Sequence, residues 1–263
     1  MSIKVTGVFE FIFLIILGLS PSADAKLIQI PAGQVRAIWL ASVKNDSTKN
    51  NEGLPRFPVK SFYMMDKAVT QFEYTQFLKK HPKWQANNVN KLFADKGYLD
   101  GIDFDVKFKS TPMTSISWFA ARAYCDSLGM RLPSVNEWEY VAAASETQKD
   151  ANKDPEFLKR ILEWYGEPRT NGLKNVGEIY KNIYDVWDMH GLIWEWVDDF
   201  NSSFVTGESR EDSSLNKDMF CGAGALSFGD KENYAAFMRF AFRSSLNGKS
   251  SIWNLGFRCV RDL

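Results

Sequence analysis

The first 25 residues constrain this chain most, because they have the pattern of a secretory signal. Lys4 precedes an apolar run at residues 11–19, Pro21 ends that run, and the small-residue motif ADA follows at residues 23–25. These three parts are typical of a cleaved leader. The run is shorter than the roughly 20 apolar residues that cross a bilayer. We therefore expect cleavage after Ala25, a mature chain without a membrane span, and export, to the periplasm if the source is a Gram-negative bacterium and otherwise by secretion.

Export would place the three cysteines of the chain, Cys125, Cys221 and Cys259, in an oxidising compartment. An odd number indicates one disulfide and one remaining thiol. A bond between Cys125 and Cys259 would join the middle of the chain to its end, and such a bond stabilises by about 4–5 kcal/mol in the loop-entropy description. Spacing alone leaves all three pairings open.

Cys125 lies in a predicted helix that begins after Ser117 and ends at Gly129. The residues expected on its buried face recur at helical spacing: Trp118, Ala121, Cys125 and Leu128.

Short helices and strands are predicted along the rest of the mature chain. Capping boxes formed by Thr70 with Glu73 and by Ser134 with Glu137 mark two helix starts. The second of these helices is expected to bury Trp138, Val141 and Ala142, and to turn Glu139 to a different side from Glu137. Strands are predicted at residues 27–30, 57–65 and 255–260. Because no linker or repeat interrupts the chain, we expect one irregular α+β domain over residues 26–263.

Charge and histidine content exclude several classes of protein. Lys plus Arg and Asp plus Glu both number 32, so there is no positive surplus for binding nucleic acid, and no nucleic-acid partner is expected. His81 and His190 are the only two histidines, which excludes a three-histidine zinc site.

Six segments, in order along the chain, together resemble the formylglycine-generating enzymes, also called sulfatase-modifying factor proteins. They are IPAG at 30–33, AVTQFEYTQF at 68–77, TSISW at 114–118 leading to AYC at 123–125, GMRLPSVNEWEY at 129–140, YDVWDMHGLIWEW at 184–196 and NLGFRC at 254–259. The resemblance covers nearly the whole mature chain. It implies a variant of the C-type-lectin-like fold with little regular secondary structure, and a disulfide between Cys125 and Cys259.

The catalytic part of the family pattern is missing. In the resembling enzymes two cysteines near the C-terminus hold copper and oxidise a cysteine of a sulfatase peptide, and Cu(I) suits paired thiolates. Aligned on Arg243, the second of these cysteines falls at Ala235, and the first falls between residues 225 and 230, where there is no cysteine. Cys221 alone cannot form a two-thiolate site. We therefore expect neither copper nor formylglycine-generating activity.

Calcium is a second metal that the resemblance brings into question. Relatives carry it near a motif that reads GLIWEW here, with Leu192 in place of an oxygen-bearing asparagine. Calcium takes about six to eight oxygen ligands, so this loss weakens a calcium loop near Gly191, Leu192 and Glu195 without excluding one built on backbone carbonyls.

Several other residues are candidates for a functional site. Cys221, His190 and Glu195 are weak catalytic candidates. His190 with Asp188 has the composition of a base and its orienting group, although a locally bonded loop histidine is the simpler interpretation. Glu195 is better explained as a buried carboxylate satisfied by an arginine or by backbone donors.

The C-terminal arginines provide the candidate binding residues. Arg239, Arg243 and Arg258 could bind an anion or carboxylate, but an internal network with Glu137, Glu139 or Glu195 is the favoured interpretation. Tyr234 begins an aromatic run, to residue 242, that fits either a peptide groove or a core.

Two functions are compatible with these observations. The first is an accessory or scaffold protein of the cell envelope, which keeps the peptide-binding fold, lacks the copper pair and binds a protein or peptide partner. The second is an oxidoreductase of altered chemistry in the same cleft, as in relatives implicated in siderophore or cofactor maturation. We favour the first function. The protein is therefore expected to be a binding protein and not an enzyme.

Overall fold

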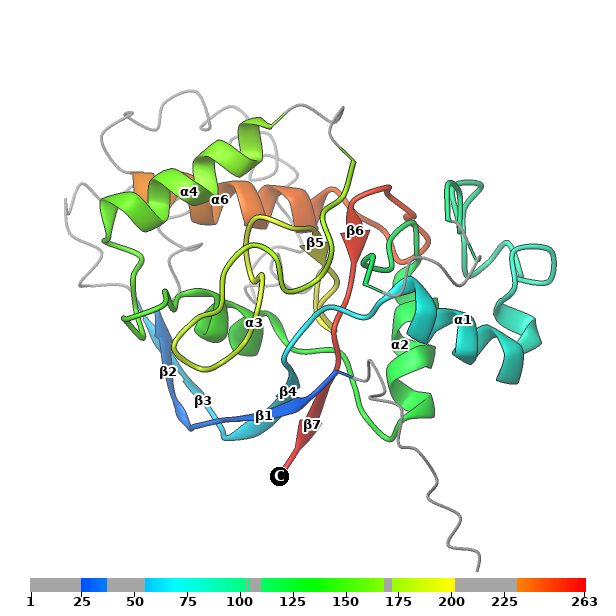
Figure 1. The fold of residues 1–263 in the computed structure, drawn as a ribbon, viewed down its shortest axis with the longest axis horizontal. Helices are drawn as coiled ribbons and strands as arrows, with labels where there is room; N and C mark the ends of the chain where they lie inside the picture. The colour runs from blue at the N-terminus through cyan, green and yellow to red at the C-terminus, as the bar shows by residue number, and fades with distance from the viewer. Residues whose placement is uncertain (1–24, 37–54, 103, 105–109, 168–171, 202–230) are drawn as a thin grey trace, which may run out of the picture.

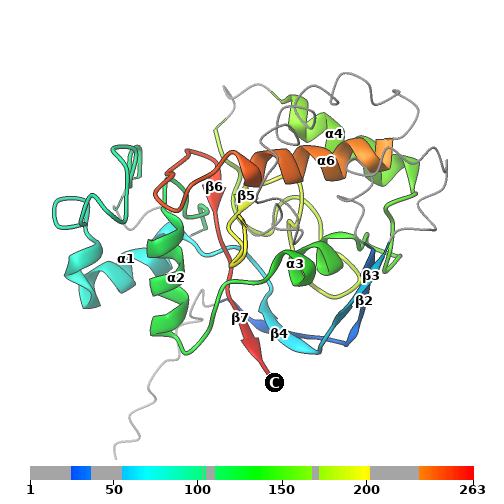
Figure 2. The same ribbon diagram turned by 180° about the vertical axis from the view of Figure 1, so that it is seen from behind.

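A computed structural model describes the chain over residues 25–36, 55–102, 104, 110–167, 172–201 and 231–263. Strands β5, β6 and β7 lie between α1 and α2 on one side and α3, α4, α6 and the β2–β3 pair on the other (Figures 1 and 2). The helices are α1 (Gln71–Lys80), the 3-10 helix η3 (Pro82–Trp84), α2 (Trp118–Ser127), α3 (Val135–Ala142), α4 (Pro155–Gly166) and α6 (Lys231–Ser244). The strands are β1 (Leu27–Ile30), β2 (Gly33–Arg36), β3 (Arg56–Val59), β4 (Phe62–Met65), β5 (Trp194–Glu195), β6 (Leu255–Gly256) and β7 (Val260–Asp262).

The sheets bring distant parts of the chain together. β4 lies between β1 and β7 in an antiparallel sheet, β2 pairs with β3 antiparallel, and β5 pairs with β6 in parallel. The first described strand, β1, and the C-terminal strand, β7, thus lie on opposite sides of β4 in one sheet. One large hydrophobic core packs between the sheets and helices, with Tyr74, Phe62, Trp196 and Phe257 among its most deeply buried side chains.

Both predicted capping boxes are confirmed. The Thr70 hydroxyl accepts from the Glu73 backbone N–H at 3.2 Å, and the Glu73 carboxylate accepts from the Thr70 N–H at 2.7 Å. The same reciprocal bonds join Ser134 and Glu137 at the start of α3. Reciprocal caps satisfy backbone donors that a helix start otherwise leaves unpaired, so these helices begin where the sequence predicts.

Two predicted strands are each divided. The segment 57–65 forms β3 and β4, because its first part pairs with β2 and its second part with β1. Ser61 marks the change, and its hydroxyl donates to the Ile30 carbonyl at 2.6 Å. The segment 255–260 forms β6 and the start of β7, because it leaves β5 and joins β4. The alternating pattern predicted extended chain correctly but carried no information on the change of partner.

The buried face predicted for α2 was partly wrong. Ala121 and Cys125 are buried, but Ala120 and Tyr124 complete the face, while Trp118 is half-buried. Leu128 is 51% exposed, because the helix ends at Ser127 before Leu128 can turn inward.

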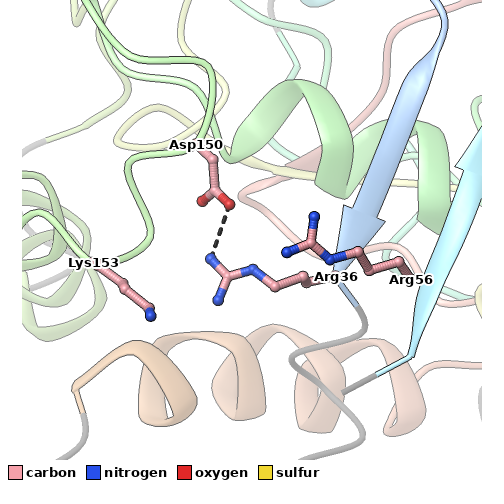
Figure 3. A pocket seen from close by; sticks show the side chains of 4 residues that line it. All are labelled: Arg36, Arg56, Asp150 and Lys153. Atoms are coloured by element: carbon pink, nitrogen blue, oxygen red, sulfur yellow. Dashed lines mark hydrogen bonds and ion pairs between the residues drawn. The ribbon is translucent and has the colours of Figure 1, made fainter. Parts of the chain in front are cut away.

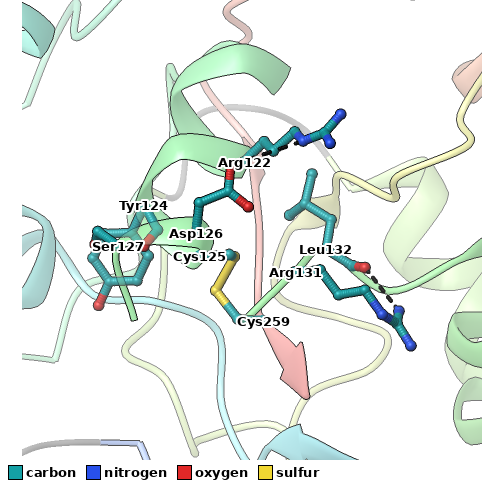
Figure 4. The surroundings of a disulfide bond; sticks show 8 residues. All are labelled: Arg122, Tyr124, Cys125, Asp126, Ser127, Arg131, Leu132 and Cys259. Carbon is teal, nitrogen blue, oxygen red and sulfur yellow. Dashed lines mark hydrogen bonds and ion pairs between the residues drawn. A yellow bond between two sulfur atoms is a disulfide. The ribbon is translucent and has the colours of Figure 1, made fainter. Parts of the chain in front are cut away.

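A disulfide joins Cys125 on α2 to Cys259 just before β7, with 5.6 Å between the two Cα atoms (Figure 4). This is the pairing that the family resemblance implies. Both cysteines are fully buried, and the Met65 N–H donates to the Cys259 carbonyl at 3.0 Å. The bond therefore ties α2 to the central sheet.

In the described part of the chain, no helix has both the length and the apolar character that crossing a membrane requires.

Candidate functional site

Helix α3 directs a carboxylate towards α6. The Glu139 carboxylate accepts from Arg239 Nε at 3.0 Å and Nη2 at 2.8 Å, and from Arg243 Nη1 at 2.6 Å. Arg239 and Arg243 lie one turn apart on α6, so both reach the same carboxylate. All three side chains are buried. Burial alone would raise the pKa of Glu139, but the two arginines outweigh it and lower that pKa to about 2.

Glu139 lies on a different side of α3 from Glu137, as predicted, and that side is the buried one. Buried positions on α3 include Val135, Trp138, Glu139 and Ala142, which follow the spacing of one helix face. Glu137 lies on another side and pairs with Arg131, whose Nη2 is 2.7 Å from the carboxylate. Glu139 thus occupies an inner position where an apolar residue would be expected, which the buried arginines of α6 explain.

A second buried ion pair lies beside the first. Arg258 donates through Nε and Nη2 to the Glu195 carboxylate, at 2.9 and 2.7 Å. Trp138 Nε1 also donates to Glu195 at 2.8 Å, and the Arg243 guanidinium lies 4.8 Å from the centre of the Trp138 ring. The Trp138 ring therefore connects the two ion pairs. The favoured interpretation of a network is correct for Glu139 and Glu195, and Glu137 takes no part in it.

His190 and Asp188 do not form a catalytic pair. His190 Nε2 is 2.9 Å from the Ala142 carbonyl, which can only accept, so this nitrogen carries the proton. Burial is the main cause that lowers the pKa of His190, to about 3. Asp188 instead accepts from the backbone N–H groups of Gly177, Ile179 and Tyr180. His190 is a locally bonded, neutral histidine, and Asp188 holds its own loop.

The side chains of the proposed calcium loop do not supply ligands for that ion. The Leu192 side chain packs with Ala68 and Ile193 in a small apolar cluster. The Glu195 carboxylate is satisfied by Arg258 and Trp138. Calcium needs about six to eight oxygen ligands, and this loop supplies no available side-chain oxygen. Within the described residues, no group of three or more His, Cys, Asp and Glu side chains is placed to hold a metal ion.

The residues do not fit a two-thiolate copper site either. Ala235, the position of the second copper cysteine in the resembling enzymes, lies on α6 and is 1% exposed. Two of the three cysteines of the chain form the disulfide. Cys221 and the position of the first copper cysteine lie outside the described residues. One thiol per chain cannot provide two thiolates.

An aromatic cavity of about 460 Å³ lies next to the ion pairs. Trp194 of β5 is its central ring. It stacks on Tyr165 at 5.1 Å between ring centres and on Phe242 at 4.4 Å, and lies 5.1 Å from Trp164. Trp253, Asn254 and the segment 172–174 complete the wall. Cavities of this size accept small molecules or short peptide segments.

One ring that lines the cavity carries a buried donor without a partner. Trp253 Nε1 is buried and has no acceptor in the described part of the chain. A buried N–H without a partner costs roughly 1–3 kcal/mol. Glu167 and Lys174 add one charge of each sign to the lining.

Most of this cavity was missed from the sequence. Helix α4 supplies Trp164 and Tyr165, and it was not predicted. Its signals were present: Asp154 caps the helix start through the Glu156 and Phe157 N–H groups, and Pro155 takes the first position. Of the candidate binding residues, Arg239, Arg243 and Arg258 are used internally, and Tyr234 is 44% exposed on α6.

Fold and sequence together define the class of protein. The model of the sulfatase-modifying factor enzyme 1-like domain matches residues 20–263. The chain therefore belongs to the sulfatase-modifying factor family, the family of the formylglycine-generating enzymes. The predicted fold class is likewise confirmed, with mixed helices and strands and modest regular secondary structure.

Individual relatives include active and inactive members by name. The formylglycine-generating enzyme of Bos taurus is 26% identical over 291 residues, covering 92% of this chain and 76% of that protein. The Streptomyces coelicolor enzyme is 30% identical over 57% of this chain and 52% of that protein. The inactive C-alpha-formylglycine-generating enzyme 2 of Bos taurus is 28% identical over 57% of this chain and 50% of that protein. Membership alone therefore does not decide activity.

Among solved structures, PvdO from Pseudomonas aeruginosa is 16% identical, with a TM-score of 0.49 over 90% of this chain and 94% of that one. CarF is 12% identical, with a TM-score of 0.49 over 91% of this chain and 99% of that one.

Proposed function

We propose that this protein is an exported accessory or scaffold protein of the cell envelope that binds a peptide segment of a partner protein and lacks formylglycine-generating activity. The observation that carries the proposal is a retained scaffold without its catalytic thiols. The disulfide and both buried ion pairs are in place, whereas at most one cysteine remains for the copper site.

The aromatic cavity is the proposed peptide site. Stacked rings offer apolar area at a low cost in side-chain entropy, which favours aromatic residues at binding surfaces. The opposite charges of Glu167 and Lys174 add polar contacts to the lining. An apolar side chain inserted against Trp194, with a polar group near Glu167 or Lys174, would use both features.

Two observations support export. Buried disulfides are characteristic of oxidising compartments, and the leader pattern at residues 1–25 would direct the chain there. The Lys26 backbone nitrogen donates to Asp66 Oδ1 at 2.8 Å. Cleavage after Ala25 would make that nitrogen a terminal ammonium with a carboxylate already beside it.

The test is peptide binding by the mature protein. A phage-displayed library of random peptides is selected on the wild type, and the affinity of an enriched peptide is measured by calorimetry. We expect Trp194→Ala and Lys174→Glu to weaken binding, the first by about tenfold or more. Phe104→Ala removes an aromatic residue that is also partly exposed but does not line the cavity, and should leave the affinity unchanged.

Folding of each variant is checked by its thermal midpoint. Lys174 is exposed, so its substitution changes the cavity without disturbing the core. The proposal fails if no peptide is enriched, or if the selected peptides bind the Trp194 and Lys174 variants as tightly as the wild type.

A further inference from the structure

A second pocket lies at the far end of the β2–β3 pair and shares no lining residue with the aromatic cavity. The residues that line it are Arg36, Arg56, Asp150 and Lys153 (Figure 3). Its volume is about 470 Å³. Three of the four lining side chains are cationic and one is anionic, so they sum to 3 − 1 = +2. The whole chain has no net charge, which makes this a local concentration of positive charge.

The two arginines are directly opposite each other. Arg36 ends β2 and Arg56 begins β3, and their Cα atoms are partners in the antiparallel register. Directly paired residues project to the same face of a sheet, and like charges in such a pair destabilise it. A counter-ion between them would remove this cost.

Asp150 compensates only part of the charge. It accepts from Arg36 Nη2 at 2.8 Å, and this fixes the Arg36 side chain, which is only 11% exposed. Arg56 and Lys153 are exposed and have no hydrogen bond or ion pair from their side chains in the described part of the chain. The pocket therefore presents a positioned guanidinium together with two cations that are available to a ligand.

We propose that this pocket binds the phosphate group of a phosphomonoester. Guanidinium groups match the oxygen geometry of phosphate, and lysine adds a point charge. The two negative charges of a phosphomonoester dianion balance the net charge of +2 on the side chains that line the pocket. The pocket is larger than a phosphate group alone requires, which leaves room for the molecule that bears it. Arg56 and Lys153 contact the phosphate, and Asp150 holds Arg36 in position.

The direct test titrates inorganic phosphate into the mature protein by calorimetry at about 20 mM salt, where screening is weak. The double variant Arg56→Gln/Lys153→Gln should weaken phosphate binding by about tenfold or more. The matched control, Arg122→Gln/Lys79→Gln, removes one exposed arginine and one exposed lysine elsewhere and should change the affinity by less than about twofold.

Thermal unfolding gives a second readout that does not depend on heat of binding. Phosphate should raise the midpoint of the wild type and of the control but not that of R56Q/K153Q. Without phosphate, R56Q/K153Q should be at least as stable as the wild type, because the opposed charges are gone. No saturable binding by the wild type, or equal binding by R56Q/K153Q, would overturn the proposal.

Two further probes distinguish the source of the phosphate. Glycerol 3-phosphate represents a soluble ester, and phosphatidylcholine vesicles carrying phosphatidic acid represent a lipid headgroup. Binding that depends on Arg56 and Lys153 identifies the form in which the pocket takes its phosphate. This site does not rest on the peptide-binding proposal, since R56Q/K153Q leaves the aromatic cavity intact.

Discussion

Glu139 on α3 and Arg239 on α6 form an ion pair in the interior of the protein, with 2.8 Å between Oε2 and Nη2 and a sequence separation of 100. Removing one partner of a buried pair leaves an uncompensated charge. We therefore expect Glu139→Gln to destabilise the protein by about 3–5 kcal/mol in urea unfolding. Asp262→Asn breaks an exposed pair with Arg131 and should cost no more than about 1 kcal/mol. Equal costs for the two variants would contradict the account of the buried network.

The same carboxylate predicts a pH dependence. The pKa of Glu139 is about 2 in the folded protein against an ordinary value of 4.5, so the unfolded chain takes up its proton first as the pH falls. The stabilising contribution is complete above pH 4.5 and is lost as the pH falls towards 2. Urea unfolding at several values in this range should show a shallower pH dependence for Glu139→Gln than for the wild type. Parallel curves would contradict the assignment.

His190 is predicted to stay neutral in mildly acidic solution. Burial lowers its pKa to about 3 from an ordinary 6.5. Below pH 6.5 the unfolded chain is protonated at this residue and the folded protein is not, so stability declines as the pH falls from 6.5 towards 3. Nitrogen chemical shifts from NMR should report an Nε2–H tautomer at pH 5. A shift to the doubly protonated ring near pH 6 would refute this.

The disulfide is expected to make a large contribution to stability. Cys125 and Cys259 are 134 residues apart, and closing a loop of that length contributes about 4–5 kcal/mol in the entropy description. Cys125→Ala/Cys259→Ala should unfold at much lower urea than the wild type. Cys221→Ala keeps the disulfide and serves as the control. If dithiothreitol destabilises the control but leaves the double variant unchanged, the effect belongs to this bond.

Gly256 is predicted to tolerate no side chain. A Cβ atom there would overlap the Met113 backbone carbonyl, which cannot move aside as a flexible side chain could. Gly256→Ala should therefore cost about 1–3 kcal/mol or more. Gly166 lies at the end of α4, and no atom of the described residues would lie within 4 Å of a Cβ atom there. Gly166→Ala should therefore stay within about 0.5 kcal/mol of the wild type. Similar stabilities for the two variants would contradict the packing around β6.

Local signals predicted local structure well. The capping boxes at Thr70 and Ser134 are confirmed because a helix start depends on side chains within three residues. The ends of strands were harder: the segments 57–65 and 255–260 change partners, and the partner is decided by residues far away in the chain. The predicted burial of Leu128 was wrong for a related reason. The helix ends one residue earlier than predicted, and the Leu128 side chain is therefore turned to solvent.

In the candidate site, too, features that depend on nearby residues were predicted, and features that depend on distant residues were not. Glu195 was correctly interpreted as a carboxylate satisfied by arginine, because a charge between two tryptophans must be neutralised when buried. Glu139 was correctly placed on a different side from Glu137, but nothing within α3 reveals that this side meets two arginines of α6. The aromatic cavity joins α4, β5, α6 and the segment before β6, and no single segment of the sequence contains it.

The central claim is that the fold is retained without a two-thiolate copper site, and it is tested most directly by elemental analysis of the purified mature protein with a thiol count on the same sample. The protein is incubated with Cu(I) and desalted, with the bovine formylglycine-generating enzyme as the positive control. We predict no stoichiometric copper, one free thiol and one disulfide per chain. One copper ion per chain, lost in Cys221→Ala, would contradict the account and restore an oxidoreductase.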